Sequence, residues 1–175
     1  NAFEPGPGVG GHCIPIDPNY LHWKAKKLGI EPKFIKLSEK INLNILKTII
    51  SKIEKIIKSK KINKKFFKIL ILGLSYKKNV DDLRESASLR LIKYFKKNNI
   101  NFEFSDPFIK KKIDTRSIKI NKKSVNITSK NLQKFNLAIL MTDHDKFNYK
   151  LIYEKSNIII DCRGRYPIDH KVIRA

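Results

Sequence analysis

One cysteine in a glycine-rich segment is the most chemically suggestive feature of this sequence. Cys13 lies in GPGVGGHCIPID, which contains no lysine although the 175-residue chain has 38 basic residues. Gly8, Gly10 and Gly11 precede the thiol, and glycine lets a ligand approach the backbone closely. Backbone N–H groups beside a thiolate can stabilise the oxyanion that forms when it attacks a carbonyl. The segment thus indicates covalent catalysis at an aldehyde or acyl carbon, or else a tight turn around a buried, inert cysteine.

Metal binding and phosphate binding are two other chemistries to consider for this segment, and both are disfavoured. His12, Asp17 and His22 lie near Cys13 in the sequence, but the spacing matches no zinc site. Adjacent histidine and cysteine ligands also fit poorly around one ion, so we expect no metal. Phosphate binding by the glycines alone is disfavoured because no Gly-Lys-Ser/Thr follows them.

The strongly basic composition raises the question of a nucleic-acid partner. The net charge is +22, but the basic residues are mostly lysines spread from Lys24 to Lys171. Base recognition favours arginine, and a binding surface gathers its charge on one face. Lysine, isoleucine and asparagine share A/T-rich codons, so a biased genome explains the composition without such a partner. We expect no nucleic acid to be bound.

Cellular location is predicted from what the sequence lacks. No apolar run approaches the roughly 18 residues of a membrane span, and no signal peptide opens the chain. Cys13 and Cys162 lie far apart and outside any CxxC pattern, which argues against a disulfide scaffold. We expect a cytoplasmic protein with no membrane partner.

A long amphipathic segment follows the cysteine region. Apolar residues recur at steps of three and four over 35–62, which predicts an α-helix with Ser38 as its N-cap. This apolar stripe needs a covering surface, either the core of the same chain or the same helix of a second copy. The shorter segment 21–30 predicts a helix that ends at Gly29.

From Phe66 onward, the pattern is that of alternating strands and helices. Apolar runs at 67–73, 101–107, 136–142 and 157–164 predict strands, and 86–97 predicts a helix capped by Ser86. This alternation predicts a parallel sheet with crossover helices. The polar residues after the strands should meet at one sheet edge, with His144 at the surface; they are Tyr76, Lys77, Asp106, Asp143, His144, Asp161 and Arg163.

Taken in order, these segments resemble the nucleotide-sugar 6-dehydrogenases, the UDP-glucose and UDP-N-acetylhexosamine dehydrogenase family. PGPGVGGHCIPIDPNYL resembles the catalytic cysteine loop of that family. KILILGLSYKKNVDDLRESASLRLI (68–92) resembles the beginning of its C-terminal UDP-binding domain. Weaker likenesses follow in the family's order at SDP (105–107), LAILMTDHDKF (137–147) and IIIDCRG (158–164).

The resemblance implies an α/β fold in which a long central helix precedes a Rossmann-like, parallel-sheet UDP-binding domain. Residues 1–34 would hold the catalytic cysteine loop and the end of the substrate region. Residues 35–64 would form the central dimerisation helix, which implies a homodimer, and 65–175 the UDP-sugar-binding domain. The family's N-terminal NAD domain is absent from this chain, because GPGVGG follows no strand and opens no helix. The chain begins at Asn1 without a methionine, so we expect a piece of a longer protein.

The resemblance also implies a reaction and its residues. Members of the family oxidise the C6 alcohol of a UDP-sugar to a carboxylate with two NAD, through a cysteine thiohemiacetal and thioester. By position, Cys13 would be the nucleophile, and Asp17 would position or activate the hydrolytic water. The remaining roles would be substrate binding by Gly8, Gly10, Gly11 and Tyr76, phosphate binding by Lys77, nucleotide-sugar binding by Arg163 and NAD binding by Arg84. From the residues alone, Arg84 could instead pair with Asp81 or Asp82, and Arg163 with Asp161.

The cysteine loop also suggests which sugar is used. In HCIPID, Ile16 stands where UDP-glucose dehydrogenases tend to have lysine, and the pattern looks more like enzymes acting on UDP-N-acetylhexosamines. Without the NAD domain, the chain alone should not turn over and should bind UDP-sugar weakly, if at all. The alternative is a stand-alone, non-catalytic UDP-sugar-binding or dimerisation module.

Overall fold

A five-stranded parallel sheet forms the centre of the protein. A computed structural model describes residues 4–110, 112–115 and 118–175. The strand order is β2-β1-β5-β6-β7, and every neighbouring pair is parallel. The strands are β1 (Lys68–Leu72), β2 (Asn101–Ser105), β5 (Leu137–Leu140), β6 (Ile159–Asp161) and β7 (Val172–Arg174). The predicted α/β class and parallel sheet are confirmed.

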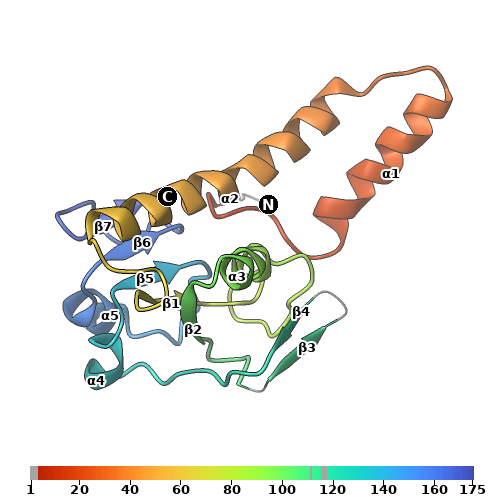
Figure 1. Cartoon of the computed structure of the whole chain (residues 1–175). Coiled ribbons are helices and arrows are strands. Elements are labelled where there is room, and N and C mark those ends of the chain that lie inside the picture. The colour runs from red at the N-terminus through yellow and green to blue at the C-terminus, as the bar shows by residue number, and fades with distance from the viewer. Residues whose placement is uncertain (1–3, 111, 116–117) are drawn as a thin grey trace.

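Helices cover both faces of the sheet (Figure 1). They are α1 (Cys13–Lys27), α2 (Lys33–Ser59), α3 (Ala87–Lys97), α4 (Ser129–Leu132) and α5 (Tyr149–Lys155). Because side chains alternate along a strand, Ile69 and Ile71 pack toward α2 and α3, whereas Leu70 and Leu72 pack toward α4 and α5. Burial on both faces explains why the strand sequences are almost continuously apolar. A small antiparallel pair, β3 (Ile113–Thr115) and β4 (Ile118–Ile120), was not predicted.

The long helix α2 begins earlier than predicted and is covered along only part of its length. It begins at Lys33, so the Ser38 cap is wrong: the Ser38 hydroxyl lies inside the helix and donates to the Phe34 and Ile35 carbonyls. Its C-terminal half packs on the sheet through buried isoleucines, which are Ile49, Ile53, Ile56 and Ile57. Within this chain, core packing therefore explains half of the apolar stripe.

Helix α1 begins much earlier than predicted. The expected loop through residue 20 is wrong, because the helix starts at Cys13 and includes Pro15 and Pro18. Pro15 is tolerated in the first turn, where backbone N–H groups have no intrahelical partner. The predicted end at Gly29 is confirmed: its φ is +74°, and the N–H groups of Gly29 and Ile30 donate to the last turn of the helix.

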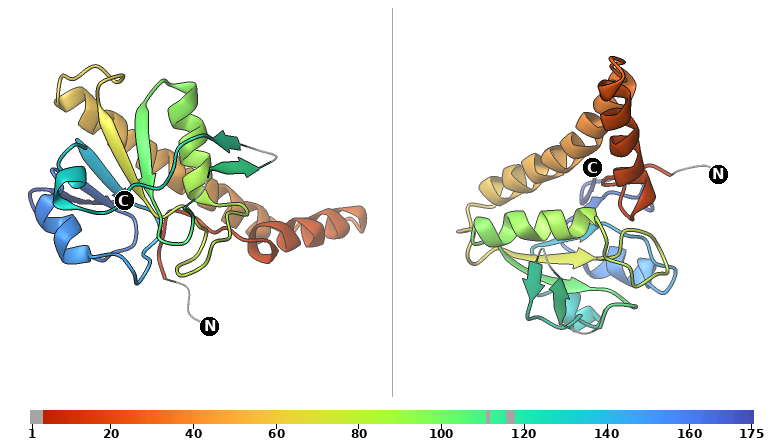
Figure 2. Two further views of the ribbon diagram at one scale, coloured as in Figure 1. Left: turned by 90° about the horizontal axis from the view of Figure 1, so that it is seen from below. Right: turned by 90° about the vertical axis from the view of Figure 1, so that its right-hand side faces the viewer.

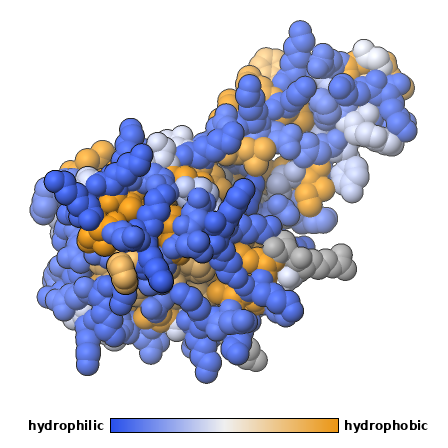
Figure 3. All heavy atoms as spheres, viewed as in Figure 1, coloured by the Kyte–Doolittle hydropathy of each residue, from blue (hydrophilic) through white to orange (hydrophobic). Residues whose placement is uncertain are grey.

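Helices α1 and α2 form a hairpin that projects from the sheet domain (Figure 2). Large apolar side chains are exposed on it, including Trp23 at 57% and Phe34 at 87% exposure. A space-filling view shows apolar side chains at the surface of this hairpin among charged ones (Figure 3). The hairpin thus leaves several large apolar side chains uncovered.

The burial difference along α2 gives a stability prediction. Ile53 is fully buried, whereas Ile41 on the same helix is 54% exposed. Shortening Ile53 to valine should lower the free energy of unfolding by about 0.5–1.5 kcal/mol, because it leaves a small cavity. Ile41→Val is the matched control and should have little effect. Urea unfolding measures both, and equal effects would show that the two halves of α2 are equally packed.

Candidate functional site

The N-terminal segment and the carboxyl edge of the sheet together enclose a small cavity. Among its lining residues are Gly8, Tyr76, Lys77, Ser88, Thr142 and Arg163. These residues come from the N-terminal segment, the turns after β1, β5 and β6, and the first turn of α3. The predicted meeting of strand-end side chains at one edge is confirmed, and the glycine-rich segment closes over them.

Three hydrogen bonds dock the glycine-rich segment onto the rest of the protein. The Val9 N–H donates to Asn42 Oδ1 of α2 (2.8 Å), and an Arg90 Nη donates to the Val9 carbonyl (3.1 Å). The Gly11 N–H donates to the Arg84 carbonyl (2.9 Å). Both the N–H and the carbonyl of Val9 are therefore held. The residues that hold them, Asn42 and Arg90, were not predicted from the sequence. Since the Gly11 N–H is already bonded, it does not face an oxyanion here.

Two of the glycines are required by close packing on Tyr76. A Cβ at Gly10 would lie 2.6 Å from Tyr76 Cβ and 2.8 Å from the Glu85 carbonyl oxygen. At Gly11, with φ +89°, a Cβ would lie 2.9 Å from the Tyr76 ring. Any larger residue would lift the segment away from the edge of the sheet, so Gly10 and Gly11 determine the path of the chain into Cys13.

Cys13 is the first residue of α1, and its thiol is exposed. The prediction of a buried, inert cysteine is therefore wrong. Asp17, also exposed, lies one turn later on the same side of α1. The two side chains are thus placed where a molecule from solvent can meet both.

Cys162 differs from Cys13 in burial and in expected reactivity. Burial raises the pKa of the Cys162 thiol, and the neighbouring Asp161 adds to this effect. Iodoacetamide at neutral pH should therefore modify Cys13 and spare Cys162, as read by peptide mass spectrometry. Cys13→Ser should abolish labelling of the folded chain. Comparable labelling of both thiols in the folded chain would contradict the burial of Cys162.

Both candidate arginines have carboxylate partners. Arg84 forms a fork with Asp82, with an Nη–Oδ2 distance of 2.6 Å, so the pairing that the residues alone suggested is present. This hydrogen bond raises the pKa of Arg84.

Arg163 has a different partner from the one considered in the sequence. Its Nε donates to Asp143 Oδ1 (2.9 Å), whereas Asp161 accepts from the Arg163 backbone N–H. The expected side-chain pair with Asp161 is therefore wrong. A Cβ at Gly6 would overlap the Arg163 guanidinium, so the N-terminal segment runs directly along this side chain.

His144 is fully buried, so its expected surface position is wrong. One ring nitrogen, Nε2, lies 3.1 Å from Asp106 Oδ2 and 3.2 Å from Ser75 Oγ, and Nδ1 accepts from the Asn79 N–H (3.0 Å). The sequence placed Asp106 and His144 after two different strands, which the sheet separates by β1, and it gave no sign that they would pair.

In residues 4–110, 112–115 and 118–175, no three His, Cys, Asp or Glu side chains are grouped as a metal site requires. No helix of this part of the chain has the length and apolar character needed to cross a membrane.

Comparison with known proteins identifies the family. The UDP-binding domain of the UDP-glucose/GDP-mannose dehydrogenase family matches residues 70–167, and the central domain of the same family matches residues 1–44. The first match alone covers more than half of the chain. The chain belongs to the UDP-glucose/GDP-mannose dehydrogenase family.

Individual relatives match over most of this chain but over a smaller part of their own length. A UDP-N-acetyl-D-mannosamine dehydrogenase of Methanocaldococcus jannaschii is 28% identical over 99% of this chain and 36% of its own. A UDP-N-acetyl-D-glucosamine 6-dehydrogenase of Pseudomonas aeruginosa is 32% identical over 61% of this chain and 25% of its own. The chain thus spans about a third of the length of such relatives.

Solved structures agree on the fold. The UDP-D-ManNAc dehydrogenase of Pyrococcus horikoshii superposes with a TM-score of 0.74 at 24% identity, over 95% of this chain and 38% of that chain. The GDP-mannose dehydrogenase of Pseudomonas aeruginosa superposes with a TM-score of 0.71 at 18% identity, over 96% of this chain and 39% of that chain. At these identities the likeness establishes the fold alone.

Proposed function

We propose that this chain is the UDP-binding and cysteine-bearing part of an NAD-dependent UDP-N-acetylhexosamine 6-dehydrogenase. The observation that carries the proposal is the cavity that joins Gly8, Lys77 and Arg163 at the carboxyl edge of the sheet. The segment that closes this cavity continues directly into Cys13 at the start of α1. A nucleotide site and a nucleophile are thereby joined by a few residues of chain.

The cavity has the charge that a nucleoside diphosphate requires. Lys77 and Arg163 supply positive side chains, and α3 directs its N-terminus, capped by Ser86, toward the same cavity. Helix N-termini at the edge of a parallel sheet bind phosphate through free N–H groups. Tyr76, packed under Gly10 and Gly11, would border the sugar on its way to Cys13.

Cys13 would perform the covalent step. Its sulfur would add to the C6 aldehyde to form a thiohemiacetal, in which the former carbonyl oxygen takes up a proton. The overall oxidation would use two NAD, one for the hydride lost when the C6 alcohol becomes the aldehyde and one for the hydride lost when the thiohemiacetal becomes the thioester. After the second hydride has left, water would attack the resulting thioester and release the carboxylate and the free thiol. Asp17, on the same side of α1, would orient that water.

Arg84 is the proposed contact to NAD. Its side chain is 63% exposed, so an anionic group of a cofactor could reach it. The hydrogen bonds to Asp82 hold and orient the guanidinium, and they leave part of it free. Both features fit a cation that binds the cofactor. We infer that this guanidinium would bind the phosphates of the cofactor.

Three finer assignments belong to the same proposal. Ile16 and the names of the relatives favour an N-acetylhexosamine as the sugar. The free thiols of Cys13 and Cys162 suit the reducing cytoplasm. Units at 1–34, 35–64 and 65–175 remain part of the proposal, with the first boundary lying two residues inside α2.

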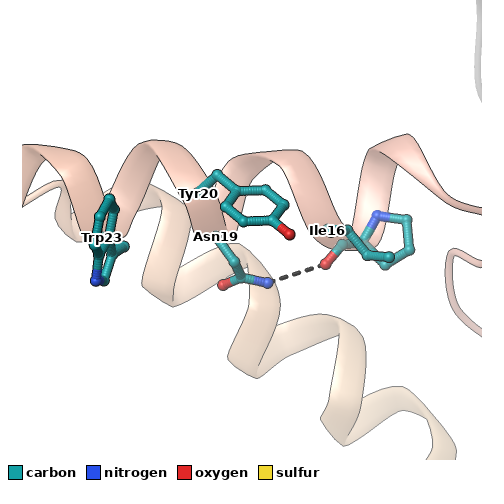
Figure 4. A pocket seen from close by; sticks show the side chains of 5 residues that line it. Ile16, Asn19, Tyr20 and Trp23 are labelled. Atoms are coloured by element: carbon teal, nitrogen blue, oxygen red, sulfur yellow. Dashed lines mark hydrogen bonds between the residues drawn. The ribbon is translucent and has the colours of Figure 1, made fainter.

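A homodimer through the α1–α2 hairpin is also proposed. An apolar hollow on α1 is lined by Pro15, Ile16, Asn19, Tyr20 and Trp23 (Figure 4). The Asn19 amide is turned to the Pro15 carbonyl (2.9 Å), which leaves the hollow apolar. Phe34 on α2 is exposed as well, and it extends this apolar surface. We infer that the surface packs against a second copy of the chain, which would remove it from water.

Protection of the thiol distinguishes an enzyme part from a purely binding module. UDP-N-acetylglucosamine and UDP-N-acetylmannosamine should slow the alkylation of Cys13, and UDP, which lacks the sugar, should slow it less. Lys77→Ala should remove this protection at the same ligand concentration. If UDP binds but neither sugar nucleotide changes the rate at Cys13, the non-catalytic binding module is the better description.

A further inference from the structure

The turn that carries Lys77 is held by side chains from two other strand ends. This turn, residues 75–79, lies between β1 and α3 and has no helix or strand of its own. The Ser75 carbonyl accepts from Thr142 Oγ1 (2.6 Å), and Ser75 Oγ donates to the Lys77 carbonyl (2.8 Å). At the other end, the Asn79 N–H donates to His144 Nδ1 (3.0 Å). The backbone of Lys77 is thus fixed on both sides.

The contacts of His144 define its protonation. Because Nδ1 accepts the Asn79 N–H, it carries no proton, so the neutral ring has its proton on Nε2. That N–H points to Asp106 Oδ2 at 3.1 Å, with Ser75 Oγ at 3.2 Å. Both ring nitrogens are therefore used, one to hold the turn and the other to anchor the ring.

Asp106 in turn fixes the ring to the frame of the sheet. Its Oδ2 also accepts the Leu74 N–H at the end of β1 (2.7 Å), and its Oδ1 accepts the N–H groups of Phe108 and Ile109 (2.8 and 3.0 Å). His144, Asp106 and Ser75 are at most 1% exposed, so water does not compete for these bonds. The turn is thereby connected to β2 and to the segment after β5.

We propose that His144 is a positioning residue for nucleotide binding. It holds the Asn79 backbone, and with Asp106 and Ser75 it fixes the turn so that Lys77 faces the cavity. A side chain that only filled space would use no ring nitrogen at all, whereas His144 uses both. The inference rests on the proposed role of Lys77 in binding the diphosphate of UDP.

The test compares His144→Phe with His144→Asn in the 175-residue chain. Phenylalanine fills similar space without nitrogen, whereas the asparagine oxygen can replace Nδ1 as acceptor for the Asn79 N–H. We expect His144→Phe to weaken UDP affinity about tenfold, a change of roughly 1.4 kcal/mol, and to accelerate hydrogen exchange of the Asn79 amide. His144→Asn should restore part of both. His170→Phe, at a side chain that is 84% exposed, is the matched control.

The two readouts separate the inference from the proposed function. If neither wild type nor His144→Phe binds UDP but Asn79 exchange accelerates in the variant, the proposed function fails, and only the structural part of the inference stands, namely that His144 holds the turn. If both bind UDP equally and Asn79 exchange is unchanged, positioning is overturned. Should His144→Phe not fold, the ¹⁵N spectrum of the wild-type ring decides: a proton on Nε2 with Nδ1 bonded to the Asn79 amide supports the inference, and a proton on Nδ1 overturns it.

Discussion

Asp106→Ala should lower the free energy of unfolding by about 3–5 kcal/mol, because it leaves several buried donors without a partner at roughly 1–3 kcal/mol each. The donors are the N–H groups of Leu74, Phe108 and Ile109 and the ring of His144. Urea unfolding followed by circular dichroism measures the change.

The control for this prediction is an exposed carboxylate. Asp114 is 66% exposed and pairs with Lys119 at 3.1 Å. Asp114→Ala should change stability by less than about 0.5 kcal/mol, as surface substitutions usually do. Similar losses in the two variants would mean that the buried bonds of Asp106 contribute no more than a surface ion pair.

The carboxylate of Asp106 also makes stability depend on pH. Burial acts to raise the pKa of Asp106, but hydrogen bonds from His144 and from the Leu74 and Phe108 N–H groups outweigh it, so the pKa lies below its ordinary value of 3.8. Because this pKa is lower in the folded state, ionised Asp106 stabilises the folded state above pH 3.8. The stabilisation is lost as the pH falls through the pKa of the folded state. Unfolding at a series of acidic pH values should show this loss, and Asp106→Asn should flatten the curve.

Lys77→Ala should weaken UDP binding about 10–100-fold, because a hydrogen bond to a charged group contributes roughly 1.5–3 kcal/mol. Lys77 is exposed beside the cavity, so its removal leaves the fold intact and the effect can be read as binding. Affinity is measured by titration of each variant with UDP.

Lys68→Ala is the matched control for Lys77. Lys68 is the first residue of β1, the strand that leads into the turn of Lys77, and it is also exposed. It therefore lies at the opposite end of the strand from the cavity. If both variants lose affinity equally, UDP binding depends on the overall charge of +22 and not on a specific site. A loss confined to Lys77→Ala supports the cavity as the nucleotide site.

Much of the fold could be predicted from local patterns. Apolar runs and their turns predicted four of the five sheet strands and the edge where Lys77, His144 and Arg163 meet. The first part of α1 was missed because Pro15 and Pro18 indicate a loop, although a helix tolerates proline in its first turn. The edge strand β7 is too short, at three residues, to give a pattern.

The candidate site was less predictable than the fold, because its contacts join distant segments. Cys13, Lys77 and Arg163 were found through motif likeness, but the pairing of Arg163 with Asp143 depends on how two strand ends face each other. The bond between Asp106 and His144 spans 38 residues, and that from Asn42 to Val9 spans 33. No local period or spacing encodes such contacts, so only the folded structure reveals them.

The central claim is that the cavity beneath the glycine-rich segment binds UDP, and an NMR titration of the ¹⁵N-labelled chain with UDP tests it most directly. We predict weak, saturable shifts of the Tyr76, Lys77, Asn79 and Arg163 amides, and much weaker binding by Lys77→Ala. Shifts that are absent, or that spread over exposed lysines and persist in Lys77→Ala, would contradict the account.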